Sequence, residues 1–361
     1  MRPKVVVVIP AWNEESSIRK AIRSIFKQDY PLEAVVVVAD NCTDSTFAGS
    51  TALCSRYRRL GVMKTVGNKA KKAGALNQGL ANLGSSTDYV LVMDADTRLH
   101  PMLLKEAINE LDNNPSLGAV CSRAGVASPP PTISFWERII WQIQHLEYGQ
   151  FGSQRVETTN RIKVVHGMAA VYRMKSLKEV VAYREKRWGI KNQFYAENNL
   201  VEDYELTLCL KELGWEVTAS MKMLAWTEVP LTLKALWRQR LRWLRGGVDS
   251  LKEHGWNRIT KWDILNHGLF ICLTCLQISI LVLVLVAISQ GIQWAWSPWL
   301  IAVFFTAYVD GLYRLKYVQD LKIGDVLVRL ALIPELVYNW FQMAAMVRAY
   351  YLSLAKVNQH W

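Results

Sequence analysis

The chain has 361 residues, of which 51% are hydrophobic, and its formal net charge is +12. A mean hydropathy of +0.06 is too apolar for an ordinary soluble enzyme, so part of the chain is expected to lie in a membrane. The positive charge suits an anionic partner, and composition alone leaves phospholipid, a nucleotide diphosphate and nucleic acid open.

The front of the chain alternates apolar runs with amphipathic stretches, which is typical of an α/β fold with a mostly parallel, Rossmann-like sheet. The runs Val5–Pro10, Ala34–Asp40 and Tyr89–Met93 predict strands that are buried on both faces. Helical periodicity between them predicts a helix after the first strand, one around Ser45–Leu60 and one over Lys72–Leu83.

Polar residues follow each of these predicted strands, at Pro10–Glu14, Asp40–Asp44 and Asp94–Asp96. Ligands of open α/β sheets collect at the carboxyl ends of the strands. We therefore expect a binding site where these segments converge, whatever family the chain belongs to.

Asp94 and Asp96 are separated by a single alanine at the end of a buried strand. Alternate residues of an extended segment project the same way, so both carboxylates can face one Mg²⁺ or Mn²⁺ ion. An isolated Asp-x-Asp is more often a solvated turn in which Asp96 and Thr97 cap a helix. The buried strand and the neighbouring polar strand ends favour the metal site.

Glu202 and Asp203 open a predicted helix that carries leucines on one face and ends at Gly214. The positive end of the helix dipole stabilises carboxylates there, so both residues can be simple helix-start charges. Asp203 can instead be a general base, which requires a substrate hydroxyl within hydrogen-bond reach. The sequence leaves both interpretations open.

Residues 231–245 predict a basic, Trp-rich helix that ends at Gly246-Gly247. It can lie in the membrane interface, with arginines on lipid phosphates and indoles among the headgroups. Within it, Gln239–Trp243 can also bind a departing diphosphate through an arginine fork and a sugar through an indole. One helix can serve both purposes.

Two smaller features favour structural interpretations. The cluster Lys69, Lys71 and Lys72 is well explained by a solvated surface. His166 and Gly167 lie in the segment 163–173, a predicted short strand and turn, and a lone histidine is more often structural than catalytic.

The chain carries no Asp, Glu, Lys or Arg from Ile264 through Val309. Ile264–Ser289 exceeds the roughly 20 apolar residues that cross a bilayer, and Trp299–Val309 begins a predicted return span. A third apolar segment, Val326–Val347, is interrupted by Arg329 and Glu335 and kinked by Pro334, so it either spans or lies along the surface.

The basic loop with Arg314, Lys316 and Lys322 places itself and the front domain in the cytoplasm by the positive-inside rule. No signal peptide is recognisable at the start of the sequence, so insertion is expected to use the C-terminal helices. The predicted organisation is a catalytic domain at 1–230, amphipathic interface helices at 231–263 and a membrane region of two to three helices at 264–361.

Seven motifs follow one another in the first 250 or so residues: VVVVIPAWNEE, VVADNCTD, KAGALNQGL, VLVMDAD, VVHGMAAVYR, VEDYEL and QRLRW. This ordered set resembles the motifs of the inverting family 2 glycosyltransferases, above all the membrane-bound branch of cellulose, chitin, hyaluronan and poly-N-acetylglucosamine synthases. The specificity of the resemblance comes from the order of the motifs. It implies a GT-A domain that takes a sugar, GlcNAc or glucose, from a UDP-sugar with Mg²⁺ or Mn²⁺.

The resemblance also implies roles for individual residues. It assigns catalysis to Asp203 as base with Glu202 beside it, and the metal to Asp96 and Asp94. The other implied positions bind nucleotide, diphosphate or acceptor: Pro10, Ala11, Asn13, Glu14, Asp40, Lys72 and Asp94 for the nucleotide, and Gln239, Arg240, Arg242, Trp243, His166 and Gly167 for diphosphate and acceptor.

The large synthases carry spanning helices ahead of the catalytic domain, and this sequence shows none there. We therefore expect a membrane-tethered transferase that adds one or a few sugars to a glycan, lipid-linked or protein-linked acceptor, rather than a processive synthase, whose channel would need a partner or a homo-oligomer. An inactive membrane module that binds nucleotide-sugar or anionic lipid is the alternative of another class. A nucleic-acid-binding protein would explain the charge and leave the spanning helices unexplained.

Overall fold

The structure is a computed structural model that describes residues 2–157, 162–292 and 298–357. Its centre is an eight-stranded sheet in the order β3-β2-β1-β4-β7-β6-β8-β5. The strands are β1 (Val5–Ala11), β2 (Ala34–Ala39), β3 (Leu60–Lys64), β4 (Tyr89–Met93), β5 (Arg98–Leu99), β6 (Leu117–Val126), β7 (Ala169–Arg173) and β8 (Glu216–Thr227). The helices are α1 (Ile18–Ile25), α2 (Thr46–Thr51), α3 (Lys71–Ala81), α4 (Leu103–Asn113), α5 (Phe135–Glu157), α6 (Met174–Trp188), α7 (Glu202–Glu212), α8 (Leu233–His254), α9 (Lys261–Ser289), α10 (Pro298–Tyr313), α11 (Ile323–Ala331) and α12 (Ile333–Leu354).

The predicted α/β fold is confirmed, and the sheet is parallel in four of its seven pairings. Residues of β1 and β4 alternate between two apolar cores, one beneath α1 and α4 and the other beneath α3, α6 and α7. This double burial is why both strands read as continuous apolar runs.

Strand β7 runs antiparallel to both β4 and β6, and this direction shapes the site. Its first residue, Ala169, pairs with Met93, the last residue of β4. The segment before β7 therefore reaches the carboxyl edge of the parallel strands, where the Asp94 amide donates to the carbonyl of Met168 at 3.2 Å. Within the predicted short strand and turn at 163–173, the strand is β7, and the residues before it cross this edge as a loop.

Two predictions of helix extent are wrong. The helix expected around Ser45–Leu60 stops at Thr51, and the chain then turns into the edge strand β3, whose mixed burial gave no clear period. Helix α8 continues through Gly246 to His254. A Cβ at Gly246 would lie 2.7 Å from Val201 Cγ2, so this glycine permits close packing of α8 on the start of α7 and does not end the helix.

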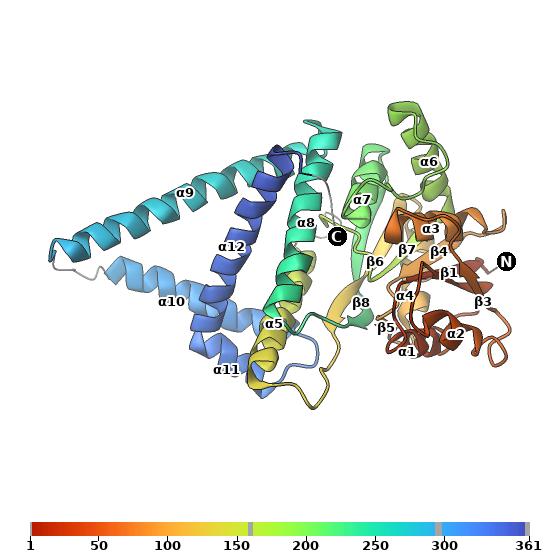
Figure 1. Cartoon of the computed structure of the whole chain (residues 1–361), viewed down its shortest axis with the longest axis horizontal. Coiled ribbons are helices and arrows are strands. Elements are labelled where there is room, and N and C mark those ends of the chain that lie inside the picture. The colour runs from red at the N-terminus through yellow and green to blue at the C-terminus, as the bar shows by residue number, and fades with distance from the viewer. Residues whose placement is uncertain (1, 158–161, 293–297, 358–361) are drawn as a thin grey trace.

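The C-terminal helices lie on the side of α8 that faces away from the sheet, where α8, α5 and α12 pack together while α9 and α10 project outward (Figure 1). Among the described helices, α9 is long and apolar enough to cross a membrane, and the pair α11 and α12, bent by 75°, adds a second if it forms one span. The predicted return span falls in α10, which has 16 residues. The bend comes at Leu332, and Pro334 lies in the first turn of α12.

Helix α3 packs so tightly on the sheet that Gly79 admits no larger residue. A Cβ at this position would lie 2.8 Å from Val38 Cγ2 and 3.0 Å from Val8 Cγ1. We predict that Gly79→Ala destabilises the chain by about 1–3 kcal/mol through overpacking. Gly84→Ala, with nothing within 4 Å, is the matched control in thermal unfolding. Equal melting temperatures for the two variants would contradict this packing.

Candidate active site

Lys72 forms the centre of the polar strand edge. Its Nζ lies 2.6 Å from Asp94 Oδ1 and 3.0 Å from Glu202 Oε1, which joins the first turn of α3 to the end of β4 and the start of α7. Burial lowers the pKa of Lys72, but Asp94, Glu202 and Asp203 together raise it well above the ordinary value. The lysine is therefore a permanent cation of the site, and its interpretation as a solvated surface residue is wrong.

Asp203 is held by backbone amides. Gly167 N–H donates to Asp203 Oδ2 at 3.0 Å and Tyr204 N–H donates to Oδ1 at 2.8 Å. A Cβ on Gly167 would lie 2.9 Å from Lys72 Nζ, so this glycine leaves room for the ammonium group beside Asp203. Burial and the neighbouring Glu202 carboxylate raise the pKa of Asp203 to about 6.

Glu202 differs from Asp203 in its charged surroundings. Burial opposes its ionisation, but the positive charges of Lys72 and Arg242 bring its pKa below the ordinary value. Adjacent carboxylates thus occupy environments that separate their protonation, and Asp203 is the one that can accept a proton near neutral pH.

Asp96 lies among other acidic groups. Burial, with Asp94 and Glu14 next, raises its pKa to about 7, while the Thr227 hydroxyl donates to its Oδ1 at 3.0 Å. Burial and nearby acids, Glu228 among them, also raise the pKa of Glu14. Thr227 and Glu228 belong to no recognised motif and were missed. The signal that could have found them is their position at the end of β8, which is parallel to β6.

The carboxylates fit a divalent cation. Asp94, Asp96 and Glu14 carry oxygen atoms, the ligands that Mg²⁺ and Mn²⁺ prefer, and the negative charges of Asp94 and Glu14 act on Asp96. A carboxyl whose pKa rises to about 7 among like charges marks a place where added positive charge is favourable.

The Asp40 side of the site is built from strained loops. Asp40 Oδ1 accepts from Thr65 Oγ1 and Asn68 Nδ2, both at 2.8 Å. Asn13, Asn41 and Lys71 have φ values of 54°, 47° and 52°, in the left-handed region. Such backbone strain clusters at binding sites, where surrounding contacts maintain it.

Three predicted nucleotide residues lie in β1 or in the loop that follows it. Pro10 and Ala11 are buried in β1, where the carbonyl of Ala11 accepts from the Asp40 amide at 2.8 Å. Asn13 Oδ1 accepts from the Thr43 amide at 2.8 Å.

Next to Asp40 a cavity of about 430 Å³ is lined by Asn68, Lys69 and Glu197 among others. A larger one, of about 850 Å³, opens at the opposite sheet edge and contains no predicted site residue.

The residues of α8 that were predicted to bind diphosphate or acceptor point in different directions. Arg242 acts on Glu202 through its charge. Arg240 is buried in an ion pair with Glu147 of α5, its Nε donates to Tyr338 Oη of α12 at 2.9 Å, and its Nη1 donates to Gln239 Oε1 at 2.8 Å.

Trp243 lies under the Arg240 guanidinium, whose Cζ is 4.4 Å from its ring centroid. The structure therefore brings Arg242 to the carboxylates and holds Gln239 and Arg240 in contacts among the helices. Trp243 also packs against the cluster that contains Val201 and Tyr204, which flank the two carboxylates of α7. His166 follows its structural interpretation, since its Nε2 contacts the carbonyl of Ser122 at 2.8 Å.

Comparisons with known proteins agree with this geometry. Residues 3–246 match the family model described as "Glycosyltransferase like family 2". A poly-beta-1,6-N-acetyl-D-glucosamine synthase of Staphylococcus epidermidis is 24% identical over 257 residues, which cover 70% of this chain and 56% of that protein. A beta-monoglucosyldiacylglycerol synthase of Synechocystis sp. is 30% identical over 255 residues, 70% and 49% of the two chains. The chain thus spans about half the length of these relatives.

The fold similarity extends further along the chain. A solved mannosyltransferase from Pyrobaculum calidifontis, in complex with GDP-Man and Mn²⁺, superposes with a TM-score of 0.62 at 18% identity. The superposition covers 99% of this chain and 89% of that one. It supports the GT-A fold for the sheet and the helices that cover it.

The acidic cluster predicts a metal-dependent stability. Folding raises the pKa of Asp96 to about 7. Without metal, the contribution of Asp96 to the stability of the fold is therefore fully present below the unfolded pKa of 3.8 and is lost as pH rises through about 7. Mn²⁺ at about one hundred times its Kd should restore about 2.7 kcal/mol above that pH.

The test is thermal unfolding in chelator and in Mn²⁺. Asp96→Asn should lose most of the pH dependence of stability and most of the stabilisation by Mn²⁺. Asp29→Asn, at an exposed ion pair with Lys105, should keep both. Equal Mn²⁺ stabilisation of Asp96→Asn and the unmodified chain would exclude Asp96 as a ligand.

Proposed function

The chain belongs to glycosyltransferase family 2 and is a glycosyltransferase, and we propose that it moves GlcNAc or glucose from a UDP-sugar to an acceptor hydroxyl with inversion. The observation that carries this proposal is Asp203. It lies half-buried beside Glu202 with a pKa of about 6, and the Gly167 amide fixes it next to the Lys72–Asp94 pair.

The proposed reaction is a single in-line displacement. Asp203 takes the proton of the acceptor hydroxyl as the acceptor oxygen bonds to the anomeric carbon, and the bond from that carbon to the UDP oxygen breaks on the opposite face. A base with a pKa near the working pH suits this proton transfer. The amides of Gly167 and Tyr204 orient the carboxylate so that it meets the hydroxyl in one geometry.

The leaving diphosphate is stabilised by fixed positive charge. Lys72 and Arg242 both act on Glu202, so both lie near the carboxylates at the start of α7 and can offset the growing negative charge. A divalent cation on Asp94 and Asp96, with Glu14 and Glu228 close by, would supply Lewis-acid stabilisation of the same diphosphate. Asp40 and its cavity are proposed to take the nucleoside.

We further propose that the chain works at the cytoplasmic face of a membrane, tethered by α9. Its apolar side chains are largely exposed, for example Leu283 at 66%. The relative named for glucosyldiacylglycerol synthesis makes a lipid-linked acceptor the first to test. A processive synthase is the second candidate, supported by the relative named for poly-N-acetylglucosamine.

Asp203→Asn should abolish turnover while leaving UDP affinity nearly intact. The unmodified enzyme should lose kcat/KM as pH falls through about 6, because the base becomes protonated. UDP release from UDP-GlcNAc or UDP-glucose with Mn²⁺, with and without diacylglycerol, measures turnover, and calorimetry measures UDP binding.

The same variant should melt at a higher temperature near neutral pH. Folding raises the pKa of Asp203, so its contribution to stability is lost as pH rises through about 6, and the neutral amide avoids this cost. Turnover retained by Asp203→Asn would remove it as the base. An unmodified chain that releases no UDP from any donor would favour the inactive binding module.

A further inference from the structure

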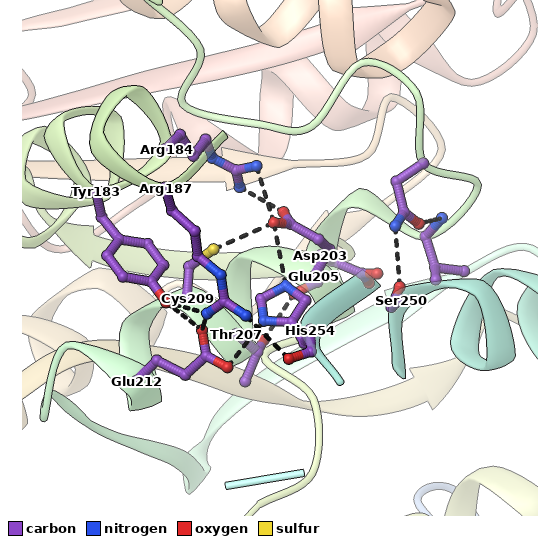
Figure 2. A network of polar contacts seen from close by, with 12 residues as sticks. Tyr183, Arg184, Arg187, Asp203, Glu205, Thr207, Cys209, Glu212, Ser250 and His254 are labelled. Carbon is purple, nitrogen blue, oxygen red and sulfur yellow. Dashed lines mark hydrogen bonds and ion pairs between the residues drawn. The ribbon is translucent and has the colours of Figure 1, made fainter. Parts of the chain in front are cut away.

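A second buried polar network lies behind the site and joins α6, α7 and α8 (Figure 2). His254, the last residue of α8, lies between two carboxylates of α7. Its Nε2 is 3.5 Å from Glu205 Oε1 and its Nδ1 is 3.0 Å from Glu212 Oε1. The imidazole side chain is fully buried, so these carboxylates are its main polar surroundings.

Each of the carboxylates also has an arginine from α6. Arg184 binds Glu205 through both Nη atoms, and Arg187 Nη1 donates to Glu212 Oε2 at 2.7 Å. The buried Arg184–Glu205 pair holds its partners in one arrangement, because separation would leave a charge buried alone. Arg187 is more exposed and adds a second link from α6 to Glu212. His254 is the connection between the two ion pairs and ties the end of α8 to α7.

The network is better explained as a brace than as a metal site. Glu205, Cys209 and His254 place ligand-type atoms within 4.8 Å of one another. Arg184 already binds both oxygens of Glu205, however, so neither oxygen is free for the close contact that a metal ion needs. Burial also raises the pKa of the Cys209 thiol, which donates to Glu205 Oε1 at 3.1 Å, so the thiolate that metals bind is disfavoured.

The brace holds the helix that carries the proposed base. Glu205 is two residues after Asp203 on α7. Thr207 Oγ1 donates to the Asp203 carbonyl at 2.6 Å and accepts from the Val165 amide at 3.0 Å, which links α7 to the loop that holds the Asp203 carboxylate. Helix α8 carries Arg242, so the packing of α7 on α8 sets where Arg242 stands relative to Glu202 and Asp203.

We propose that His254 is a positioning residue that, when protonated, binds Glu205 and Glu212 and so fixes α7 on α8 with Asp203 and Arg242 in register for catalysis. The proposal rests on the proposed transferase function. His254 is outside every motif of the sequence analysis and does not touch the proposed reacting groups.

Titration of His254 would make the brace pH-dependent. Burial lowers its pKa, but the Glu205 and Glu212 carboxylates beside it raise it above the ordinary 6.5. The other charged or titratable groups facing it are Arg184 and Arg187 from α6, Cys209 from α7 and Glu253 from α8. Because the folded pKa is raised, the stabilisation is fully present below 6.5 and is lost as pH rises through the folded pKa.

The test uses the full chain in detergent with UDP-GlcNAc and Mn²⁺ as probes. His254→Gln should lower kcat for UDP release on the order of tenfold to a hundredfold, as expected for a base displaced by about 1 Å, while the Kd for UDP stays within about twofold. In the unmodified chain kcat should fall as pH rises through the folded pKa of His254, and this alkaline fall should be absent in His254→Gln. His254→Lys, which keeps a cation, should recover part of the rate. Lys186→Gln, exposed on α6, is the matched control.

A separate readout distinguishes failure of the brace from failure of the proposed function. The difference in melting temperature between the unmodified chain and His254→Gln should be large at about pH 6 and shrink at about pH 9, with no substrate needed. The proposal would be overturned if this difference in melting temperature were the same at both pH values, or if kcat of His254→Gln depended on pH as kcat of the unmodified chain does. If His254→Gln does not fold, Glu212→Gln replaces it and should move the alkaline fall to lower pH; an unmoved fall would likewise overturn it.

Discussion

The site depends on one ammonium group placed among carboxylates that could not otherwise remain ionised together. Lys72 contacts Asp94 and Glu202 and also acts on Asp203. Without it, burial and mutual repulsion would protonate part of the group. Because Lys72 is fixed in α3, which packs tightly on β1 and β2 at Gly79, the position of the positive charge is set by the core of the fold.

This placement also distinguishes the two adjacent acids at the start of α7. The positive charges of Lys72 and Arg242 lower the pKa of Glu202. The hydrogen bonds that hold Asp203 come from backbone amides, and its pKa rises to about 6. The sequence resemblance names both residues as catalytic. The electrostatic difference supports Asp203 as the base and gives Glu202 the task of holding the cations, since a residue that stays ionised cannot exchange protons near neutral pH.

The sequence predicts the parts of this site that repeat a local rule. Buried parallel strands with polar ends place Asp40 and Asp94 at one edge, because β1, β2 and β4 pair in parallel. It could not predict the direction of β7, which depends on pairing with β4 across about eighty residues of chain, or the contribution of Glu228. Arg240 and Arg242 look equivalent in the sequence, but residues two apart on a helix point in very different directions. The distant Glu147 and Tyr338 decide that Arg240 faces the helical layer.

A base with a raised pKa needs a rigid helix beneath it. Ionised Asp203 is costly because it is half-buried beside the Glu202 carboxylate, and a helix free to shift would relieve that cost by letting in water and lowering the pKa. The dipole at the start of α7 stabilises both carboxylates but does not fix their place. The buried Arg184–Glu205 pair on the same helix resists such a shift, because movement would leave its charges buried and separated. The contacts of Glu212 with Arg187 and His254 add to this resistance. The network around Glu205 and Glu212 thus maintains the raised pKa of Asp203 at the start of α7.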